Sequence, residues 1–426
     1  MNGANGRLTF AELYLDRRVM VVALLGFSSG LPLLLVFSTL SFWLKDAGVS
    51  IALIGAFSLA RMPYTFKFAW APLLDRAAIP WLTPALGKRR SWALVIQSLL
   101  LLSILAMGQT DPSQNLWLTA ALAALVSFFS ASQDVVIDAY RIESLDERRQ
   151  GAGAGTFTLG YRAGMLTSGA GALWLATVFS WGQVYALMAA LAVVGMVTIL
   201  LSPEPRVMER PPAPHGAWLE TTFIAPFRDF LTRNPRWPVI LLFIPLYKLG
   251  DAYLGAMANP FYVEMGFDKT EIAEISKVYG TLATIAGGII GGWVVGRIGI
   301  INSLLICGTL QAASNLVYVA QTLAGRDLGM LMLTISVENV TGGMASSSFV
   351  AYLSSLCGGG YTASQYALLS ALMAFSRDAL SSTSGVAVET MGWSTFFMFT
   401  AALALPGLAL ALWLAKTPAV VKQASS

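Results

Sequence analysis

Acidic residues interrupt several long apolar runs of this 426-residue chain. A charged side chain in hydrocarbon costs ~2.5–3.5 kcal/mol on the insertion scale unless it faces protein or water, so each one is a candidate functional residue. Asp134 and Asp138 lie four positions apart in the run 115–140, which places both on one face of a helix. Two neighbouring carboxylates tend to hold a proton, because ionising both is unfavourable. They are therefore our first candidates for proton coupling.

Each of these carboxylates also has a structural interpretation. Asp138 precedes Arg141 by three residues and could form a salt bridge with it. Asp134 lies one turn deeper without a basic neighbour in sequence, so its partner must come from another helix, with Arg61 and Arg162 as candidates. We favour function for Asp134 and structure for Asp138.

A second polar group lies later in the chain. Lys248 and Asp251 are three residues apart and could either neutralise each other or belong to a substrate site, with Asp251 as a third candidate for proton coupling. Glu338 and Asn339 precede Thr341-Gly342-Gly343, a polar and flexible stretch typical of a cavity wall.

The remaining polar residues at membrane depth indicate the nature of a ligand. Cationic side chains suit an anionic group, whereas amides and phenols can hydrogen-bond hydroxyls and amides. We therefore predict a large, polar, acidic solute. The predicted substrate-binding residues are Arg61, Tyr64, Lys67, Gln133, Tyr161, Arg162, Lys248, Gln311, Asn315, Glu338, Asn339 and Arg377.

Transmembrane helices must position these residues. The chain is 56% apolar and 12% charged, with a mean hydropathy of +0.66, a balance unsuited to a water-facing surface. A spanning helix needs ~20 mostly apolar residues. We predict an all-α membrane protein of about twelve such helices, at about 19–44, 51–75, 91–109, 115–140, 152–177, 181–202, 237–264, 271–296, 301–323, 328–357, 362–390 and 393–415.

Charge and proline content divide these spans into two sets of six. We expect an N-terminal six-helix half at 1–202, a cytoplasmic linker at 203–236, a C-terminal six-helix half at 237–416 and a cytoplasmic tail at 417–426. Segments on the side of the termini hold eighteen lysine and arginine residues, against three on the opposite side. Because basic residues resist translocation, both termini are predicted to be cytoplasmic.

This layout is similar to that of the major facilitator superfamily. After the second predicted span, Asp75-Arg76 and Gly87-Lys88-Arg89-Arg90 resemble that superfamily's loop, in which the aspartate pairs with cations and helix ends of the other half and latches one conformation. An insert of ten residues before Gly87 departs from the pattern. Anchoring by the positive-inside rule is an alternative role for the basic cluster.

Glycine and proline have local roles in this layout. Gly30-Leu31-Pro32 is predicted to bend the first span, either beside a cavity or as a packing kink. The glycines of the run 287–296 lie four apart and favour close helix packing. The predicted gating residues are Asp75, Arg76, Arg89, Arg90, Gly30 and Pro32.

Other function classes find little support in the residues. The one histidine, His215, lies in the polar linker, and the two cysteines lie in predicted spans, so neither a metal cluster nor a histidine proton relay is predicted. The positive charge lies at helix ends and does not form a basic stripe with aromatics, which argues against nucleic-acid binding. We expect a monomer in a lipid bilayer, without metal or cofactor, and not an enzyme.

Eight motifs are spread along nearly the whole chain, namely GFSSGLP (Gly26–Pro32), FKFAWAPLLDR (Phe66–Arg76), SASQDVVIDAY (Ser130–Tyr140), LGYRAGML (Leu159–Leu166), LYKLGDA (Leu246–Ala252), ENVTGGM (Glu338–Met344), TASQYALLSAL (Thr362–Leu372) and GWSTFF (Gly392–Phe397). Together they resemble the AmpG-type muropeptide permeases.

The resemblance implies proton-driven import of N-acetylglucosaminyl-1,6-anhydro-N-acetylmuramyl peptides through a Gram-negative inner membrane, for peptidoglycan recycling and, indirectly, β-lactamase induction. It places substrate and proton handling at Gln133-Asp134. The alternative within transport is a carrier of acetyl-coenzyme A or another anionic solute. A membrane-embedded acyl- or glycosyltransferase is the alternative outside transport.

Overall fold

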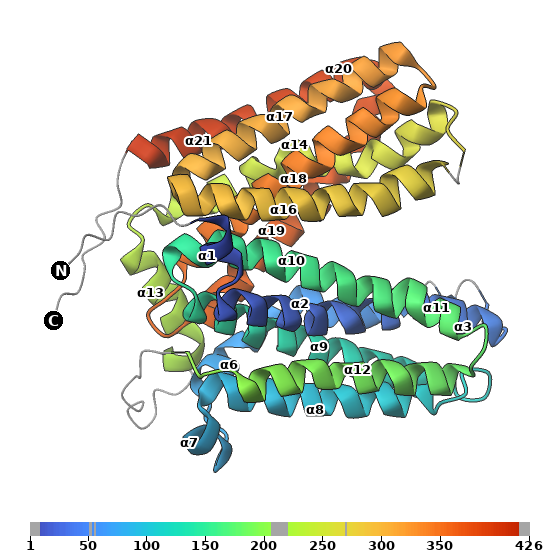
Figure 1. Ribbon diagram of the computed structural model, residues 1–426, viewed down its shortest axis with the longest axis vertical. Helices are drawn as coiled ribbons and strands as arrows, with labels where there is room; N and C mark the ends of the chain where they lie inside the picture. The colour runs from blue at the N-terminus through green and yellow to red at the C-terminus, as the bar shows by residue number, and fades with distance from the viewer. Residues whose placement is uncertain (1–8, 51–52, 55–56, 206–219, 269–270, 417–426) are drawn as a thin grey trace.

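A computed structural model describes residues 9–50, 53–54, 57–205, 220–268 and 271–416. The side chains of residues 58, 61, 273 and 376–380 also lie outside this description. Within the described residues every regular element is a helix. The helices form two bundles that lie side by side with their long axes roughly parallel (Figure 1).

The N-terminal bundle is formed by the first half of the chain. Its longer helices are α2 (Arg17–Leu35), α3 (Ser38–Asp46), α8 (Lys88–Gly108), α9 (Leu116–Ser144), α10 (Gln150–Leu166) and α12 (Trp181–Leu201). Shorter elements connect them, namely η1 (Phe57–Arg61), α5 (Met62–Phe66), η2 (Lys67–Ala69), α6 (Ala71–Arg76), α7 (Leu82–Leu86), η3 (Glu147–Arg149), η4 (Thr167–Gly171) and α11 (Ala172–Leu175). The core of this bundle is aliphatic, with Leu31, Leu100 and Val184 among its fully buried residues.

The C-terminal bundle is formed by the second half. Its elements are α14 (Trp237–Glu264), η6 (Ile272–Tyr279), α16 (Gly280–Ile298), α17 (Ile300–Ala324), α18 (Leu328–Leu356), α19 (Thr362–Ser381), α20 (Ser384–Leu403) and α21 (Leu405–Lys416). Its core is more aromatic, since Phe243 packs against Tyr247, Phe349 and Tyr352.

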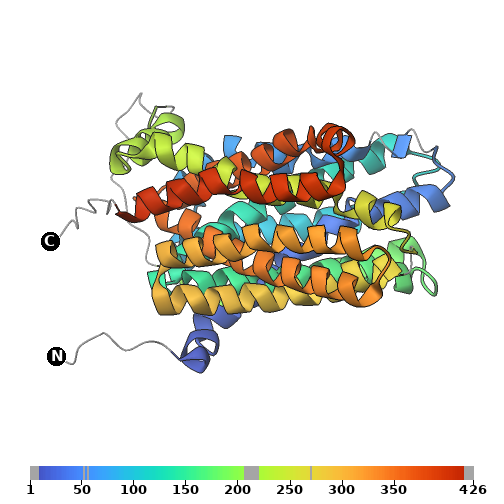
Figure 2. The same cartoon turned by 90° about the horizontal axis from the view of Figure 1, so that it is seen from above.

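Four short or terminal elements mark one end of both bundles. Helix α1 (Phe10–Tyr14), the linker elements η5 (Glu220–Ile224) and α13 (Ala225–Arg233), and the last turn of α21 all lie there (Figures 1 and 2). We call this end the terminal face. The opposite end is called the distal face.

Eight described helices are long and apolar enough to cross a membrane by length and composition. They are Arg17–Asp46, Lys88–Gly108, Leu116–Ser144, Trp181–Leu201, Trp237–Glu264, Glu274–Ile298, Ile300–Ala324 and Ser384–Lys416. The predicted span 51–75 is not one continuous helix, because its described part is divided among η1, α5, η2 and α6. Pro63 and Pro72 explain the interruptions, since proline has no N–H for a helical hydrogen bond.

The junction of the last two predicted spans lies inside α20. Gly392 has a φ of +72°, a conformation that L side chains rarely adopt, and it separates two helical pieces. The predicted spans 362–390 and 393–415 meet at this turn.

Glycine allows the closest helix contacts. A Cβ at Gly160 of α10 would lie 1.8 Å from the carbonyl oxygen of Ala23 on α2. On α16, a Cβ at Gly287 would lie 2.1 Å from the carbonyl oxygen of Val340 on α18, whereas one at Gly292 would lie 2.6 Å from that of Gly151 on α10. The packing role predicted for the α16 glycines is confirmed.

We predict that Gly160→Ala destabilises the protein, because the added methyl has only the backbone of α2 to meet. Overpacking of this kind typically costs about 1–3 kcal/mol. The measurement is thermal unfolding of the purified protein in detergent. Gly385→Ala is the matched control, since a Cβ there meets nothing within 4 Å and helical alanine is favourable by about 1 kcal/mol. An equal melting temperature for both variants would contradict this account of the α2–α10 contact.

Candidate functional site

A buried carboxylate joins the two bundles at the terminal face. Asp75, the penultimate residue of α6, accepts hydrogen bonds from the backbone N–H groups of Ala363 at 3.2 Å and Ser364 at 2.7 Å, and from the Ser364 hydroxyl at 2.5 Å. Both amides belong to the first turn of α19, where unpaired N–H groups and the helix dipole favour an anion. A side chain of the N-terminal bundle thus caps a helix of the C-terminal bundle.

Arg89 neutralises this carboxylate from within its own bundle. Its guanidinium, with no exposed surface, donates to Asp75 at 2.7 Å and to the two carboxylate oxygens of Glu143 at 2.7 and 2.8 Å. We call Asp75, Arg89, Glu143 and Ser364 the terminal-face latch. Removing one partner from a buried ion pair typically costs about 3–5 kcal/mol, because the other charge stays buried.

Glu204 supports the latch from the segment that follows α12. Its carboxylate accepts from the backbone N–H groups of Arg89 at 2.7 Å and Arg90 at 3.0 Å, and so caps the start of α8. Burial raises the pKa of Glu204 above its usual value, and these two hydrogen bonds oppose the rise.

Arg141 on α9 makes a second connection between the bundles. Its guanidinium lies 3.4 Å from Asp138 of the same helix, and it donates at 3.3 Å to the hydroxyl of Ser354 on α18. The cation also lies over the ring of Tyr366 on α19, 5.3 Å from its centroid. The salt bridge considered for Asp138 is therefore present.

The linker helix α13 holds the same end of α19. The Gln365 amide donates to Asp229 at 2.8 Å and accepts from Arg233 at 2.7 Å. The backbone N–H of Gly358 also donates to Gln365, at 3.0 Å. The terminal face is thus closed by contacts from α6, α9 and α13 to α18 and α19.

The side chains of the other predicted gating residues take no part in the latch. Arg90 donates to the carbonyl oxygens of Ile199 and Leu200 at the end of α12. Arg76 makes no ion pair with any residue that the structure describes. A Cβ at Gly30 would lie 2.0 Å from the carbonyl oxygen of Tyr161, which supports a packing role.

Pro32 lies inside α2, three residues before that helix ends at Leu35. The chain then turns at Phe37, whose φ and ψ of −117° and −102° are not helical, before α3 begins. The first span therefore stays helical through Gly30-Leu31-Pro32, and its break lies at Phe37, five residues beyond the proline.

Asp134 lies in the interior of the N-terminal bundle. One carboxylate oxygen, Oδ1, is buried and has no hydrogen-bond partner within the described chain. The charges of Lys67 and Asp138 act on this carboxylate. Arg162, considered as a partner, makes no ion pair with the described residues, and the Arg61 side chain lies outside them.

The neighbours of Asp134 are held by hydrogen bonds within the same bundle. The buried Gln133 amide donates to the carbonyl oxygen of Ser28 on α2 at 2.8 Å. The hydroxyl of Tyr64 on α5 donates to Ser130 at 2.8 Å, one turn before Asp134. The ring of Tyr161 on α10 packs against Phe157, with their centroids 6.0 Å apart.

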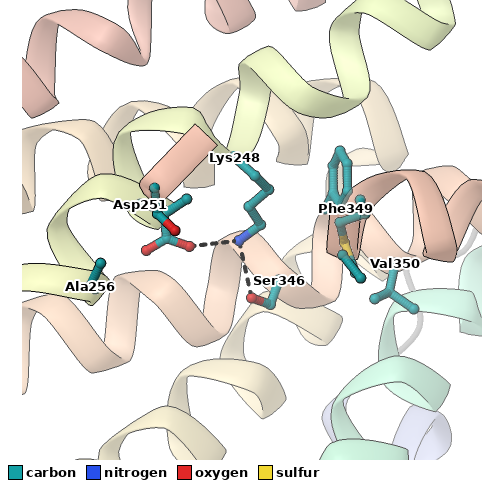
Figure 3. Close-up of a pocket in the computed structure, with 11 residues that line it drawn as sticks. Lys248, Asp251, Ala256, Ser346, Phe349 and Val350 are labelled. Carbon is teal, nitrogen blue, oxygen red and sulfur yellow. Dashed lines mark hydrogen bonds and ion pairs between the residues drawn. The ribbon is translucent and has the colours of Figure 1, made fainter. Parts of the chain in front are cut away.

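The C-terminal bundle contains a cavity of about 530 Å³, lined by α14, α18 and α19 (Figure 3). The Lys248 ammonium lies at its wall, 3.2 Å from Asp251 and 3.3 Å from the hydroxyl of Ser346. Phe349 and Val350 supply part of its apolar lining. Among the described residues, the cavity therefore offers the Lys248 cation, the Asp251 carboxylate and the hydroxyls of Ser346 and Ser381 against an apolar wall.

Two buried amides lie behind the ion pair. The Gln311 amide donates to Asp251 at 3.2 Å, and the Asn315 amide donates to Thr400 at 3.2 Å. Both residues line a small void beside Lys248 and Asp251.

Glu338 and Asn339 lie on α18, where Asn339 contacts α16. Asn339 donates to Glu338 at 2.7 Å and accepts from the hydroxyl of Thr284 at 2.7 Å. The Arg377 side chain lies outside the described residues.

Several residues of the site were not predicted from sequence. Glu143, Glu204, Ser346 and Ser364 are ordinary polar residues near helix ends or on an apolar helix. Their contacts span 54 to 289 positions of sequence, so no local pattern could have indicated these pairs. The local pattern Thr362-Ala-Ser-Gln365 resembles a helix start, but it does not indicate which residue contacts that helix.

Comparison with known proteins agrees with this architecture. Residues 22–379 match the family model of the Major Facilitator Superfamily. Among solved structures, the chain is similar to the proton:xylose symporter XylE, with a TM-score of 0.64 at 11% identity over 94% of each chain. It is also similar to the transporter FucP in the outward conformation, with a TM-score of 0.66 at 12% identity over 94% of this chain and 99% of that one. The fold and the buried charges define a multi-pass membrane transporter of this superfamily.

Relatives of higher sequence identity show which family within the superfamily the chain belongs to. The anhydromuropeptide permease of Escherichia coli strain K12 is 43% identical, covering 95% of this chain and 81% of that protein. A Rickettsia conorii transporter named AmpG 4 is 37% identical, covering 96% of this chain and 99% of that protein. The chain belongs to the AmpG-type permeases of the major facilitator superfamily.

We predict that Asp75→Asn opens the terminal face. The neutral amide loses the ion pair with Arg89 and places an N–H group against the N–H groups of α19. Cys357 is a natural reporter, because it follows the last residue of α18 beside Gly358. In a Cys307→Ala background, labelling of Cys357 by a polar maleimide in nanodiscs should be several-fold faster in the variant.

Arg76→Gln is the matched control, since Arg76 adjoins Asp75 but takes no part in the latch. Its labelling rate should equal that of the parent. Equal rates in the Asp75→Asn and Arg76→Gln proteins would refute the latch.

Proposed function

We propose that this protein imports N-acetylglucosaminyl-1,6-anhydro-N-acetylmuramyl peptides from periplasm to cytoplasm by proton symport. The observation that carries the proposal is the 43% identity to the Escherichia coli anhydromuropeptide permease across 95% of the chain. The membrane would be a Gram-negative inner membrane, and the imported peptides would serve peptidoglycan recycling and, indirectly, β-lactamase induction.

The cavity of the C-terminal bundle supports an acidic, sugar-containing substrate. Its volume of about 530 Å³ lies within the usual range of ligand pockets, ~300–1,000 Å³. Lys248 can exchange Asp251 for a substrate carboxylate, while Ser346 can hydrogen-bond a hydroxyl or an amide. The apolar wall at Phe349 and Val350 suits the faces of sugar rings or alkyl parts of a stem peptide.

Asp134 is our first choice for the carboxylate that carries the proton. Asp138 is engaged by Arg141, and Asp251 by Lys248, whereas one oxygen of Asp134 lacks a hydrogen-bond partner in the described chain. An ionisable group inside a membrane bundle without a full set of partners is typical of a proton relay.

The proposed orientation places the terminal face in the cytoplasm, in accordance with its excess of lysine and arginine. The structure would then be closed on the cytoplasmic side by the terminal-face latch. Import would require that latch to open after substrate and proton have bound.

We expect Asp134→Asn to abolish gradient-driven accumulation while keeping substrate exchange. A permanently neutral side chain can still pass through the transport cycle with substrate bound, but it cannot release a proton. The measurement is uptake of labelled anhydromuropeptide into proteoliposomes, with an inward proton gradient for accumulation and with preloaded substrate for counterflow.

Asp138→Asn and Asp251→Asn form the comparison set in this assay. The coupling carboxylate is the one whose loss stops accumulation and spares counterflow. Uptake by the unaltered protein that ignores the proton gradient would refute proton symport, and normal accumulation by Asp134→Asn would refute the assignment.

We expect Lys248→Gln/Asp251→Asn to weaken binding of the acidic substrate. A hydrogen bond to a charged group is worth about 1.5–3 kcal/mol, which corresponds to roughly 10–100-fold in Kd. Replacing both partners avoids an unpaired buried charge. Lys277→Gln is the control, since Lys277 contacts Asn259 and not the ion pair.

Binding is measured by calorimetry with anhydromuropeptide and with acetyl-coenzyme A as a competitor. Competition by acetyl-coenzyme A and not by the disaccharide would favour the alternative carrier. An unchanged affinity in the double variant would remove Lys248 from the substrate site.

A further inference from the structure

A groove between α2 and α12 lies outside the proposed transport path. It encloses about 550 Å³, and its lining is apolar except at the terminal face, where Arg17, Thr198 and Ser202 lie. Its walls include Leu24, which is 48% exposed, and Val197, which is 47% exposed. Because α2 and α12 are both long enough to cross a membrane, these exposed walls face lipid.

Arg17 lines the polar end of the groove, and Arg90 of α8 binds the same end of α12. Arg17 donates to the carbonyl oxygen of Leu201 at 2.9 Å, and Arg90 donates to that of Leu200 at 2.7 Å. These carbonyls are consecutive and belong to the last turn of α12, so both cations bind the same helix end. A helix C-terminus attracts cations, which explains why both are held there.

Arg17 retains unused binding capacity. A guanidinium has five N–H donors, and within the described chain that of Arg17 makes one hydrogen bond and no ion pair. Asp16, which precedes Arg17, and Glu204, which follows the end of α12, are already engaged. Asp16 pairs with Arg18 at 3.1 Å and Arg149 at 3.0 Å, and Glu204 caps α8.

The apolar part of the groove extends away from these cations. Arg17 to Leu24 covers seven residues of α2, which at 1.5 Å per residue is about 10 Å of depth. On α12 the lining reaches Ala190, with Val193, Val194 and Val197 between it and the polar end. A ligand that fits has an anionic group at one end and a hydrocarbon chain at the other.

We propose that this groove is a binding site for one anionic glycerophospholipid. Its phosphodiester would lie on Arg17 with Arg90 adjacent, and one acyl chain would follow Val21 and Leu24 opposite Val193 and Val197. Charge complementarity selects an anionic over a zwitterionic headgroup, because a zwitterionic lipid brings its own ammonium to a site whose polar end is cationic. A lipid in this groove would contact both α2 and α12 and so connect these two helices of the N-terminal bundle.

The test uses the full-length protein in detergent and native mass spectrometry. Phosphatidylglycerol and phosphatidylethanolamine with identical acyl chains are titrated separately, and the lipid-bound fraction is measured. The unaltered protein should bind the first phosphatidylglycerol several-fold more tightly than phosphatidylethanolamine. Arg17→Gln should reduce that preference to near unity.

A second variant tests the apolar part without altering charge. Ala190→Phe places a ring in the groove from an exposed position and should weaken binding of both lipids. The matched controls are Arg297→Gln, an exposed arginine at the terminal face of the other bundle, and Leu310→Phe, a 43% exposed position on α17. Both controls should bind as the unaltered protein does.

Three outcomes would overturn the proposal. The two lipids could titrate identically, Arg17→Gln could keep the full preference, or Arg297→Gln could lose as much as Arg17→Gln, which would indicate general surface electrostatics. The melting temperature of each variant, measured in parallel, identifies a variant that fails to fold. Muropeptide uptake does not enter the measurement, so its result is independent of the proposed substrate.

Discussion

The contact between α10 and α16 is the interaction on which the arrangement of the two bundles depends. In lipid, the hydrophobic effect contributes little to helix association, and close backbone approach takes its place. Gly151 and Gly155 of α10 meet Gly288 and Gly292 of α16 at backbone distance. Because Gly151 and Gly155 belong to the first turns of α10, the bundles are closest on the terminal side.

That proximity decides which charges are structural. At the terminal face the bundles are near enough for Asp75 to reach the amides of α19 and for Arg141 to reach Ser354. The buried Arg89 there pairs with both Asp75 and Glu143. Deeper in the molecule, Asp134 has a carboxylate oxygen without a hydrogen bond in the described chain, and Lys248 faces a cavity. The latch is a closed set of ion pairs and hydrogen bonds, whereas the candidate transport residues include an unpaired carboxylate oxygen at Asp134 and an ion pair that faces a cavity at Lys248.

The sequence predicted the all-helical bundles and the close packing of the α16 glycines because both follow from local hydrophobicity and spacing. It also predicted the pairs Asp138–Arg141 and Lys248–Asp251, since residues three apart meet on a helix. It did not predict a broken second span, where Pro63 and Pro72 outweigh apolar content. Contacts such as Glu143–Arg89 and Asp75–Ser364 could not be predicted, because they require the relative placement of helices far apart in sequence.

The position of Asp134 suggests how its protonation could affect the contact between the two bundles. Asp138 lies one turn along α9, on the same face, and its charge acts on Asp134. Asp138 also pairs with Arg141, whose guanidinium contacts Ser354 and Tyr366 of the other bundle. Protonation of Asp134 would remove a negative charge that repels Asp138, and so would change the balance between Asp138 and the cross-bundle partners of Arg141. In the proposed cycle, a proton taken up by Asp134 in the N-terminal bundle would therefore affect the contact of Arg141 with Ser354 and Tyr366 in the C-terminal bundle.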